Sequence, residues 1–186
     1  MSEPITRKDF LKGMFGFLRN AAVKEQKNTI DKLDNYLLPP GSAQLEEFLQ
    51  TCRQSYKCVS VCPYEAIEVY RENAEDALYG YPVINPQRQA CHWCEDFPCI
   101  TACESGALNI ERKDWPLGTA VILEDFCFSY RGVFCAACVV KCPLSGAAIT
   151  MVDNKPVINE QKCTGCGLCV QACPTEQRAI WIKAAN

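Results

Sequence analysis

The run C-T-G-C-G-L-C-V-Q-A-C-P, residues 163–174, decides the fold of this chain. Its spacing, C-x2-C-x2-C-x3-C-P, is typical of a loop that binds an iron–sulfur cluster. Three close thiolates can reach three irons of one cube, whereas the fourth, followed by proline, usually ligates the neighbouring cluster. The run therefore predicts iron–sulfur clusters that occur in pairs.

Four variants of this pattern follow one another along the chain. Their members are Cys52, Ser55, Cys58 and Cys62; Cys91, Cys94, Cys99 and Cys103; Cys127, Cys135, Cys138 and Cys142; and Cys163, Cys166, Cys169 and Cys173. In the first group Ser55 stands at the second ligand position. The second and third groups have longer gaps, before Cys99 and before Cys135 respectively. The chain is therefore mostly a scaffold for clusters.

Fifteen cysteines in 186 residues could also indicate disulfides or zinc. An odd count at such close spacing argues against a disulfide framework. Zinc sites are built from two separated cysteine pairs rather than from one continuous run. Iron–sulfur binding is the preferred interpretation, and a zinc-bound structural adaptor is the alternative from a different class.

Charge and hydropathy exclude further classes. The formal net charge is −3 with neutral thiols, and each oxidised [4Fe–4S] cluster with four thiolates would add about −2. Nucleic-acid binding needs basic patches, so the acidic charge argues against this function. No stretch of apolar residues is long enough to predict a membrane span.

Short apolar stretches flank the cysteine groups and predict an α+β fold of hairpins and small helices. One stretch follows each group, at residues 66–69, 107–110, 148–151 and 179–182, and others precede the last three groups, at residues 82–85, 120–123 and 156–159. Their β-branched content favours short strands beside the cluster loops. We expect folding to be coupled to cluster insertion, as in other small metal domains.

The N-terminal segment carries no cysteine, and a helix is expected from residue 6 to about Leu37. Thr6 and Asp9 form a capping box at its start, and the helix would stop at Leu38-Pro39-Pro40-Gly41. Residues 6–12 also resemble a twin-arginine export signal with lysine as the second basic residue. Arg19 interrupts the apolar part that such a signal needs, so a cytoplasmic location is expected and a periplasmic one is the alternative.

The arrangement resembles the ferredoxin-type electron-transfer subunits of the NapG/MauM type. The resemblance rests on residues 38–41, on C-H-W-C-E-D-F-P-C at residues 91–99, on the long gap before Cys135 and on the terminal run. It implies tandem bacterial-ferredoxin-like dicluster modules behind an N-terminal helical extension, residues 1–41. The polyferredoxin domain would span residues 42–186, with an outer module of 42–80 plus 152–186 and an inner module of 81–151.

The resemblance also implies three [4Fe–4S] clusters with twelve cysteine ligands. They would be held by Cys62, Cys163, Cys166 and Cys169; by Cys91, Cys94, Cys99 and Cys142; and by Cys103, Cys127, Cys135 and Cys138. The remaining Cys52, Ser55, Cys58 and Cys173 would form a fourth site. That site could hold a [3Fe–4S] cluster, hold a [4Fe–4S] cluster with Ser55 as a hard oxygen ligand, or stay empty.

The expected function is electron transfer within a larger oxidoreductase complex. No phosphate-binding loop, dinucleotide fingerprint or catalytic triad motif occurs, so no catalytic site is expected on this chain. The implied partners are a catalytic oxidoreductase subunit, such as a tungsten or molybdenum pterin enzyme, and a further redox donor or acceptor protein. The alternatives are a freely diffusing polyferredoxin, an exported quinol-linked NapG-like subunit, and a catalytic cluster at the incomplete first group.

Overall fold

The computed structural model describes residues 36–185, which belong to one compact unit. This part of the chain consists of short helices and three two-stranded antiparallel sheets. None of its helices combines the length and the apolar character needed to cross a membrane. We call residues 36–115 the first half and residues 116–185 the second half, because each contains two cysteine groups and repeats the same plan.

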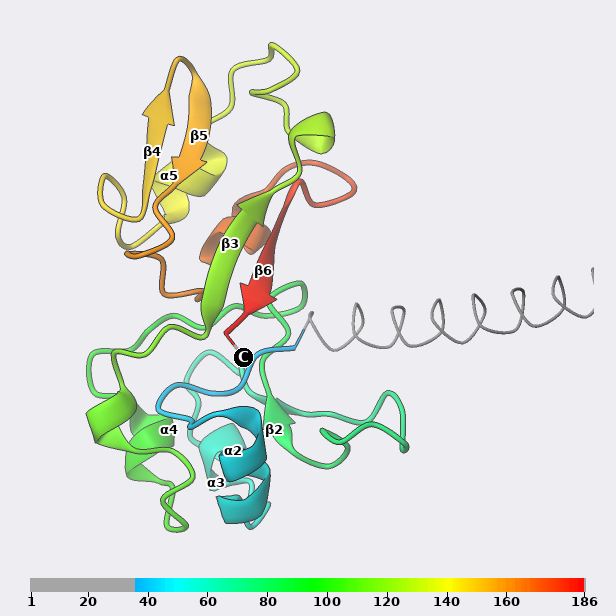
Figure 1. Ribbon diagram of the computed structural model, residues 1–186, viewed down its shortest axis with the longest axis vertical. Helices are drawn as coiled ribbons and strands as arrows, with labels where there is room; N and C mark the ends of the chain where they lie inside the picture. The colour runs from blue at the N-terminus through cyan, green and yellow to red at the C-terminus, as the bar shows by residue number, and fades with distance from the viewer. Residues whose placement is uncertain (1–35, 186) are drawn as a thin grey trace, which may run out of the picture. The chain divides into compact units, whose positions relative to one another are not determined.

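The second half begins and ends with paired strands. Strand β3 (Gly118–Ile122) lies antiparallel to β6 (Ile180–Ala184), with Ala120 opposite Ile182. Figure 1 shows these two strands side by side. The elements between them are η2 (Glu124–Phe126), α5 (Ala137–Lys141), β4 (Ile149–Val152), β5 (Lys155–Ile158) and α6 (Leu168–Ala172). Strands β4 and β5 form a hairpin, and α5 contacts α6.

The first half follows the same plan with less regular strands. Its elements are α2 (Leu45–Thr51), α3 (Lys57–Ser60), β1 (Glu68–Val69), β2 (Pro82–Val83), α4 (Pro98–Thr101) and η1 (Ile110–Arg112). A single antiparallel bridge between Ser42 and Leu108 takes the place of the β3–β6 pair. Strands β1 and β2 form the hairpin, and α3 contacts α4 as α5 contacts α6.

Apolar side chains and thiols share one core. Leu37, Phe48 and Ile84 from the first half and Val170 from the second are almost completely buried. Five cysteines are buried in the same cluster of side chains: Cys58, Cys91, Cys99, Cys166 and Cys169. The aliphatic residues therefore surround the thiols instead of forming a separate core.

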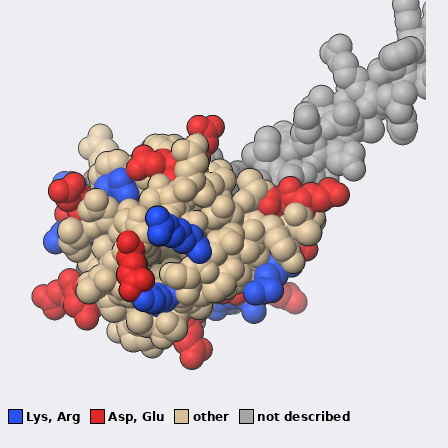
Figure 2. All heavy atoms as spheres, turned by 90° about the horizontal axis from the view of Figure 1, so that it is seen from below, with Lys and Arg blue, Asp and Glu red and all other residues tan. Residues whose placement is uncertain are grey.

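Charged side chains of both signs are interspersed over the face that Figure 2 shows. On this face the basic side chains do not gather into the continuous surface that nucleic acid requires. Described ion pairs include Arg88–Glu68 at 2.8 Å and Arg112–Glu47 at 3.3 Å, each with one strongly exposed partner. Exposed pairs of this kind contribute little to stability.

The predicted α+β fold with short hairpins is confirmed, and six of the seven predicted strand stretches contain strands. The exception, residues 107–110, contains only the bridge at Leu108. The predicted modules are wrong, because β3 of the supposed inner module pairs with β6 of the supposed outer one. Each half closes on itself, as expected when sequential elements are also neighbours in space.

The N-terminal boundary also differs from the prediction. Tyr36 and Leu37 are buried, and Leu37 forms an antiparallel bridge with Ile84, so they belong to the fold and not to an extension ending at residue 41. The rest of the predicted helix and the signal-like segment lie outside the described residues. They stay predictions.

Candidate iron–sulfur cluster sites

Each cysteine lines one of four cavities, and all fifteen are free thiols. We call these cavities sites I to IV. Their polar ligand candidates are Cys52, Ser55, Cys58 and Cys103 in site I; Cys62, Cys91, Cys94 and Cys99 in site II; Cys127, Cys135, Cys138 and Cys173 in site III; and Cys142, Cys163, Cys166 and Cys169 in site IV. The four cavities are similar in size.

The structure brings together the first three members of every group, but it assigns the fourth cysteine differently from the prediction. Cys62 lies in site II and Cys103 in site I, so the first two groups exchange their last thiols. Cys142 lies in site IV and Cys173 in site III, so the last two groups do the same. The expected exchange between outer groups and between inner groups is therefore wrong.

Helix packing is the physical reason for this exchange. Each fourth cysteine follows a short helix, and the contacts between α3 and α4 and between α5 and α6 lie within one half. Helix α5 leads directly to Cys142 and α6 directly to Cys173. Each helix thus delivers its last thiol to the adjacent loop of the same half.

The cluster loops have left-handed backbone positions that suit a chain wrapped around a group. In site IV these are Gly165, with φ of 70°, and Gly167, with φ of 87°. In site II they are Trp93 at 53° and Phe97 at 41°, which are unusual for bulky residues. Such positions turn successive cysteines toward the same side of the loop.

Backbone N–H groups donate hydrogen bonds to several of the thiols. The donor–sulfur pairs are Ala66–Cys62 and Leu108–Cys103 at 3.3 Å, and Trp93–Cys91, Ala120–Cys163 and Ala179–Cys173 at 3.4 Å. Hydrogen bonds to a thiolate favour its ionised form, which is the form that binds iron. The residues present therefore fit an iron–sulfur cluster at these loops.

Hydroxyl groups also contact thiols, including those of the fourth cysteines in sites III and I, and the sequence analysis missed these contacts. Thr175 Oγ1 lies 3.0 Å from Cys173 Sγ in site III, and Ser105 Oγ lies 3.6 Å from Cys103 Sγ in site I. When the thiol is ionised, the hydroxyl must be the donor. A Ser or Thr two residues after the fourth cysteine is the signal that could have indicated this contact.

Burial shifts the ionisation of most of these thiols. It raises the pKa of Cys58 and Cys138 to about 11 and that of Cys91 and Cys99 to about 12. Burial also opposes ionisation of Cys103, but hydrogen bonds from Leu108 and Ser105 outweigh it and lower the pKa below its ordinary value. Because iron binds thiolates, iron must displace protons from these buried thiols as it binds.

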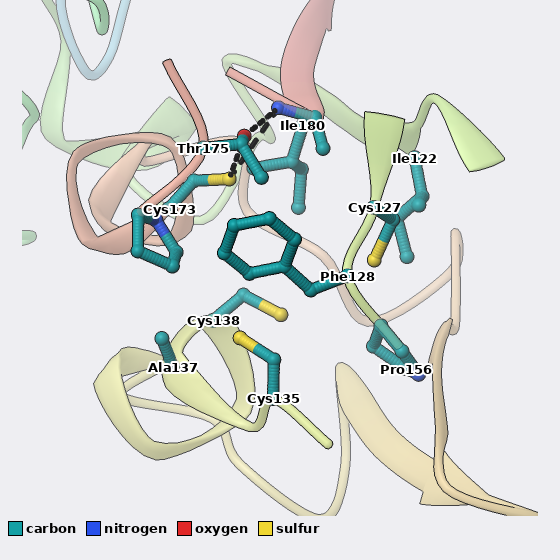
Figure 3. A pocket seen from close by; sticks show the side chains of 12 residues that line it. Ile122, Cys127, Phe128, Cys135, Ala137, Cys138, Pro156, Cys173, Thr175 and Ile180 are labelled. Atoms are coloured by element: carbon teal, nitrogen blue, oxygen red, sulfur yellow. Dashed lines mark hydrogen bonds between the residues drawn. The ribbon is translucent and has the colours of Figure 1, made fainter. Parts of the chain in front are cut away.

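Figure 3 shows site III from close by. The thiols of Cys127, Cys135, Cys138 and Cys173 surround one space, and the ring of Phe128 lies among them. Ile122, Pro156, Ala179 and Ile180 complete an apolar lining. The lining is apolar, and the Phe128 ring is partly exposed at its edge.

The four sites form a continuous series in the order I, II, IV, III. Sites I and II adjoin because helix α3, which carries Cys58, contacts helix α4, which carries Cys99. Sites II and IV adjoin because the backbone N–H of Cys91 donates a 2.9 Å hydrogen bond to the Cys166 carbonyl. Sites IV and III adjoin because helix α6, which carries Cys169, contacts helix α5, which carries Cys138.

His92 lies beside site II without being needed as a ligand. Its ring stacks on Tyr64, with centroids 3.6 Å apart and an interplanar angle of 2°. Burial, together with the positive charge of Lys141 from the second half, lowers the pKa of His92. The stacked pair therefore covers site II close to the boundary between the halves.

Among residues 36–185, no three His, Cys, Asp or Glu side chains converge on a point where they could bind one metal ion. The thiols instead line shared cavities, with four cysteines around each of sites II and III. A polynuclear group suits that arrangement, because its irons are spread over the corners of a cube.

Comparison with known proteins gives the same assignment. A family model described as a 4Fe-4S binding domain matches residues 156–177. The methylamine utilization ferredoxin-type protein MauM of Paracoccus denitrificans is 34% identical over 154 residues, 76% of this chain and 68% of that protein. The ferredoxin-type protein NapG of Escherichia coli is 32% identical over 159 residues, 77% of this chain and 68% of that protein.

A more distant relative matches half of the chain. The polyferredoxin-like subunit of aliphatic sulfonate oxidoreductase from Pyrococcus furiosus is 33% identical over 93 residues, 50% of this chain and 48% of that protein. The resemblance stated from the motifs is confirmed by the longer matches. The chain belongs to the family of ferredoxin-type 4Fe–4S electron-transfer proteins that includes MauM and NapG.

Proposed function

We propose that this protein is the electron-transfer subunit of an oxidoreductase complex and that sites II, III and IV each hold a [4Fe–4S] cluster. The observation that carries this proposal is the uninterrupted series of thiol sets from site I to site III, joined by helix contacts and by the Cys91–Cys166 hydrogen bond. Bound there, such clusters accept and release single electrons at potentials between about −700 and +450 mV. The ligand sets of the three clusters are the corrected ones given above.

The chain's own residues hold the groups and control their surroundings. The N–H donors of Ala66, Ala120 and Ala179 stabilise thiolates in sites II, IV and III respectively. Phe128 and other apolar residues line site III. Hydrogen bonding and solvent access are the means by which a protein sets cluster potential.

The proposed partners are a catalytic oxidoreductase subunit and a second redox protein, one at each end of the series. One support is that the Pyrococcus furiosus relative is named as a subunit of an oxidoreductase. Another is the exposure of apolar side chains on the elements around site III: Phe126 (44%), Val133 (57%), Phe134 (73%) and Val140 (80%). A tungsten or molybdenum pterin enzyme in the cytoplasm is the catalytic partner that we propose.

Anaerobic purification with iron and sulfide analysis tests the proposal. We expect a brown protein whose visible absorption decreases on reduction, with about twelve irons from three cubes and more if site I is occupied. A colourless protein that stays folded without iron would overturn it. Affinity purification from the native cells should recover the catalytic subunit, whereas recovery of the chain alone would favour a freely diffusing polyferredoxin.

A further inference from the structure

The loop of site I has the backbone of a cluster loop although its sequence lacks one cysteine. Gln54, with φ of 51°, and Tyr56, with φ of 59°, adopt the left-handed conformation that Gly165 and Gly167 adopt in site IV. These positions correspond one to one, because both loops have the same spacing. Side chains other than glycine rarely adopt this conformation, so the retained shape indicates a loop that still surrounds a bound group.

Ser55 occupies the place in this loop that Cys166 occupies in site IV. It lines one cavity together with Cys52, Cys58 and Cys103. The Cys103 thiol keeps the features of a ligand, since it accepts a hydrogen bond from the Leu108 N–H at 3.3 Å. Three thiols and one hydroxyl therefore surround site I in the arrangement that four thiols have elsewhere.

The neighbouring polar side chains are engaged in other contacts. The hydroxyl of Tyr56 donates a hydrogen bond to the Gly80 carbonyl at 3.1 Å, and Lys57 pairs with Glu104. Arg53 is exposed, although part of it lines the cavity. These contacts argue against a site I whose interior is filled by its own loop.

We propose that site I binds a [4Fe–4S] cluster through the thiolates of Cys52, Cys58 and Cys103, and that the fourth iron faces Ser55 and has an oxygen ligand. This inference rests on the proposed function and adds a chemically distinct end to the series. Oxygen is a harder donor than sulfur and a less favoured ligand for iron in such a cluster. The fourth iron of site I should therefore leave before any other iron in the protein.

Controlled oxidation tests this inference. One equivalent of ferricyanide takes one electron and is reduced to ferrocyanide, and the cluster changes from [4Fe–4S]²⁺ to [3Fe–4S]⁺ with release of one Fe²⁺. Anaerobic protein should begin with about sixteen irons and lose about one, with the electron paramagnetic resonance signal of one [3Fe–4S]⁺ centre per chain. Addition of Fe²⁺ and a reductant should restore the lost iron and remove the signal.

Two substitutions make the test specific to Ser55. Ser55→Cys restores the full ligand set, so this variant should keep all its iron under the same oxidation and show no [3Fe–4S]⁺ signal. Cys94→Ser creates the same serine at the corresponding position of site II. With two equivalents of ferricyanide, one for each cluster, it should release a second iron and double the signal, while visible absorption from sites III and IV reports that the chain stays folded.

Several results would overturn the inference. Wild-type protein with about twelve irons, increased by four in Ser55→Cys, would show that site I is empty. About sixteen irons without release on oxidation would show that the fourth iron of site I has a strong ligand. Both results leave the electron-transfer proposal intact, whereas absence of clusters from every site would overturn both.

Discussion

Thr175 and Ser105 place hydroxyl groups against the fourth thiols of sites III and I, which are the two ends of the series. The corresponding positions in the other two groups hold Tyr64 and Leu144. Leucine has no hydroxyl, and the hydroxyl of tyrosine lies at the far end of the ring. A hydrogen bond to a thiolate stabilises the more negatively charged, reduced state of a cluster. The fourth thiols at the ends of the series therefore differ in their contacts from the fourth thiols in its middle.

Replacing Thr175 should change the potential of site III. In Thr175→Val the hydroxyl donor to Cys173 is lost, and we expect the midpoint potential to fall by about 20–60 mV, because a hydrogen bond contributes about 0.5–1.5 kcal/mol and a tenfold change corresponds to about 59 mV. A redox titration followed by electron paramagnetic resonance measures this shift. Thr175→Ser keeps the donor and should keep the potential. Equal potentials in all three proteins would contradict the assignment.

Removing the Phe128 ring should expose site III to solvent. In Phe128→Ala we expect visible absorption to bleach in air at least about threefold faster, because the apolar shell controls solvent access to a metal site. Phe134 belongs to the same insertion and is 73% exposed, but it does not line the cavity. Phe134→Ala is the matched control and should bleach at the wild-type rate. Equal rates for both variants would show that Phe128 does not shield the site.

At the residue scale the sequence indicated the cysteines that line the cavities, but not the residues around them. Regular spacing identified all the cysteines and the position of Ser55, since cluster loops need close thiols in a fixed order. Thr175 was missed although its place two residues after Cys173 is a local signal. Phe128 carries no comparable spacing, because its contacts depend on the course of the insertion before Cys135.

Among the elements, the loops of sites II and IV contact each other across the boundary between the two halves. A Cβ atom added at Gly167 would lie 2.5 Å from Cβ of Pro86. Beside it, Gln171 Nε2 on α6 donates a 3.0 Å hydrogen bond to Gln89 Oε1. Together with the bond from Cys91 to Cys166, these contacts fix the spacing between the two inner sites.

Gly167→Ala should lower the stability of the protein by more than the strain of an alanine in the left-handed conformation. Gly146 has a similar φ, 85° against 87°, but nothing lies within 4 Å of a Cβ added there. Gly146→Ala should cost about 1–2 kcal/mol of stability from backbone strain, and Gly167→Ala about 1–3 kcal/mol more from the clash with Pro86. The temperature at which visible absorption is lost on heating compares them. Similar losses in both variants would show that the contact with Pro86 is unimportant.

Strand positions were predictable because β-branched stretches flank each loop, but their partners were not. The pairing of β3 with β6 joins segments about sixty residues apart, and nothing in either stretch identifies the other. Helices α3 to α6 have only four or five residues each, too few for a periodic pattern to indicate the faces that meet. Tertiary packing decides both questions.

At the scale of the whole molecule, four similar cysteine groups can be paired in several ways. The family resemblance favoured exchange between outer groups and between inner groups, and the structure shows exchange within each half instead. Spacing along the chain cannot decide between these arrangements, because every group carries the same kind of fourth cysteine. The first and last segments of each half pair with each other, and this pairing determines which cysteine groups exchange their fourth thiols.

Single cysteine substitutions distinguish the two arrangements. We expect Cys173→Ala to alter the same paramagnetic signal as Cys138→Ala, because both thiols line site III. Cys103→Ala should alter the signal of site I, which Cys58→Ala also alters. If Cys103→Ala instead changed the signal that depends on Cys138, the grouping within halves would be wrong.

The crossing of each last thiol into the adjacent loop also has an evolutionary consequence. Deleting any one loop would disable two sites, because the loop supplies three thiols to one site and one thiol to another. The smallest piece that can be duplicated, lost or transplanted intact is therefore a half with both of its sites. An electron-transfer protein built in this way gains or loses two cluster sites at a time.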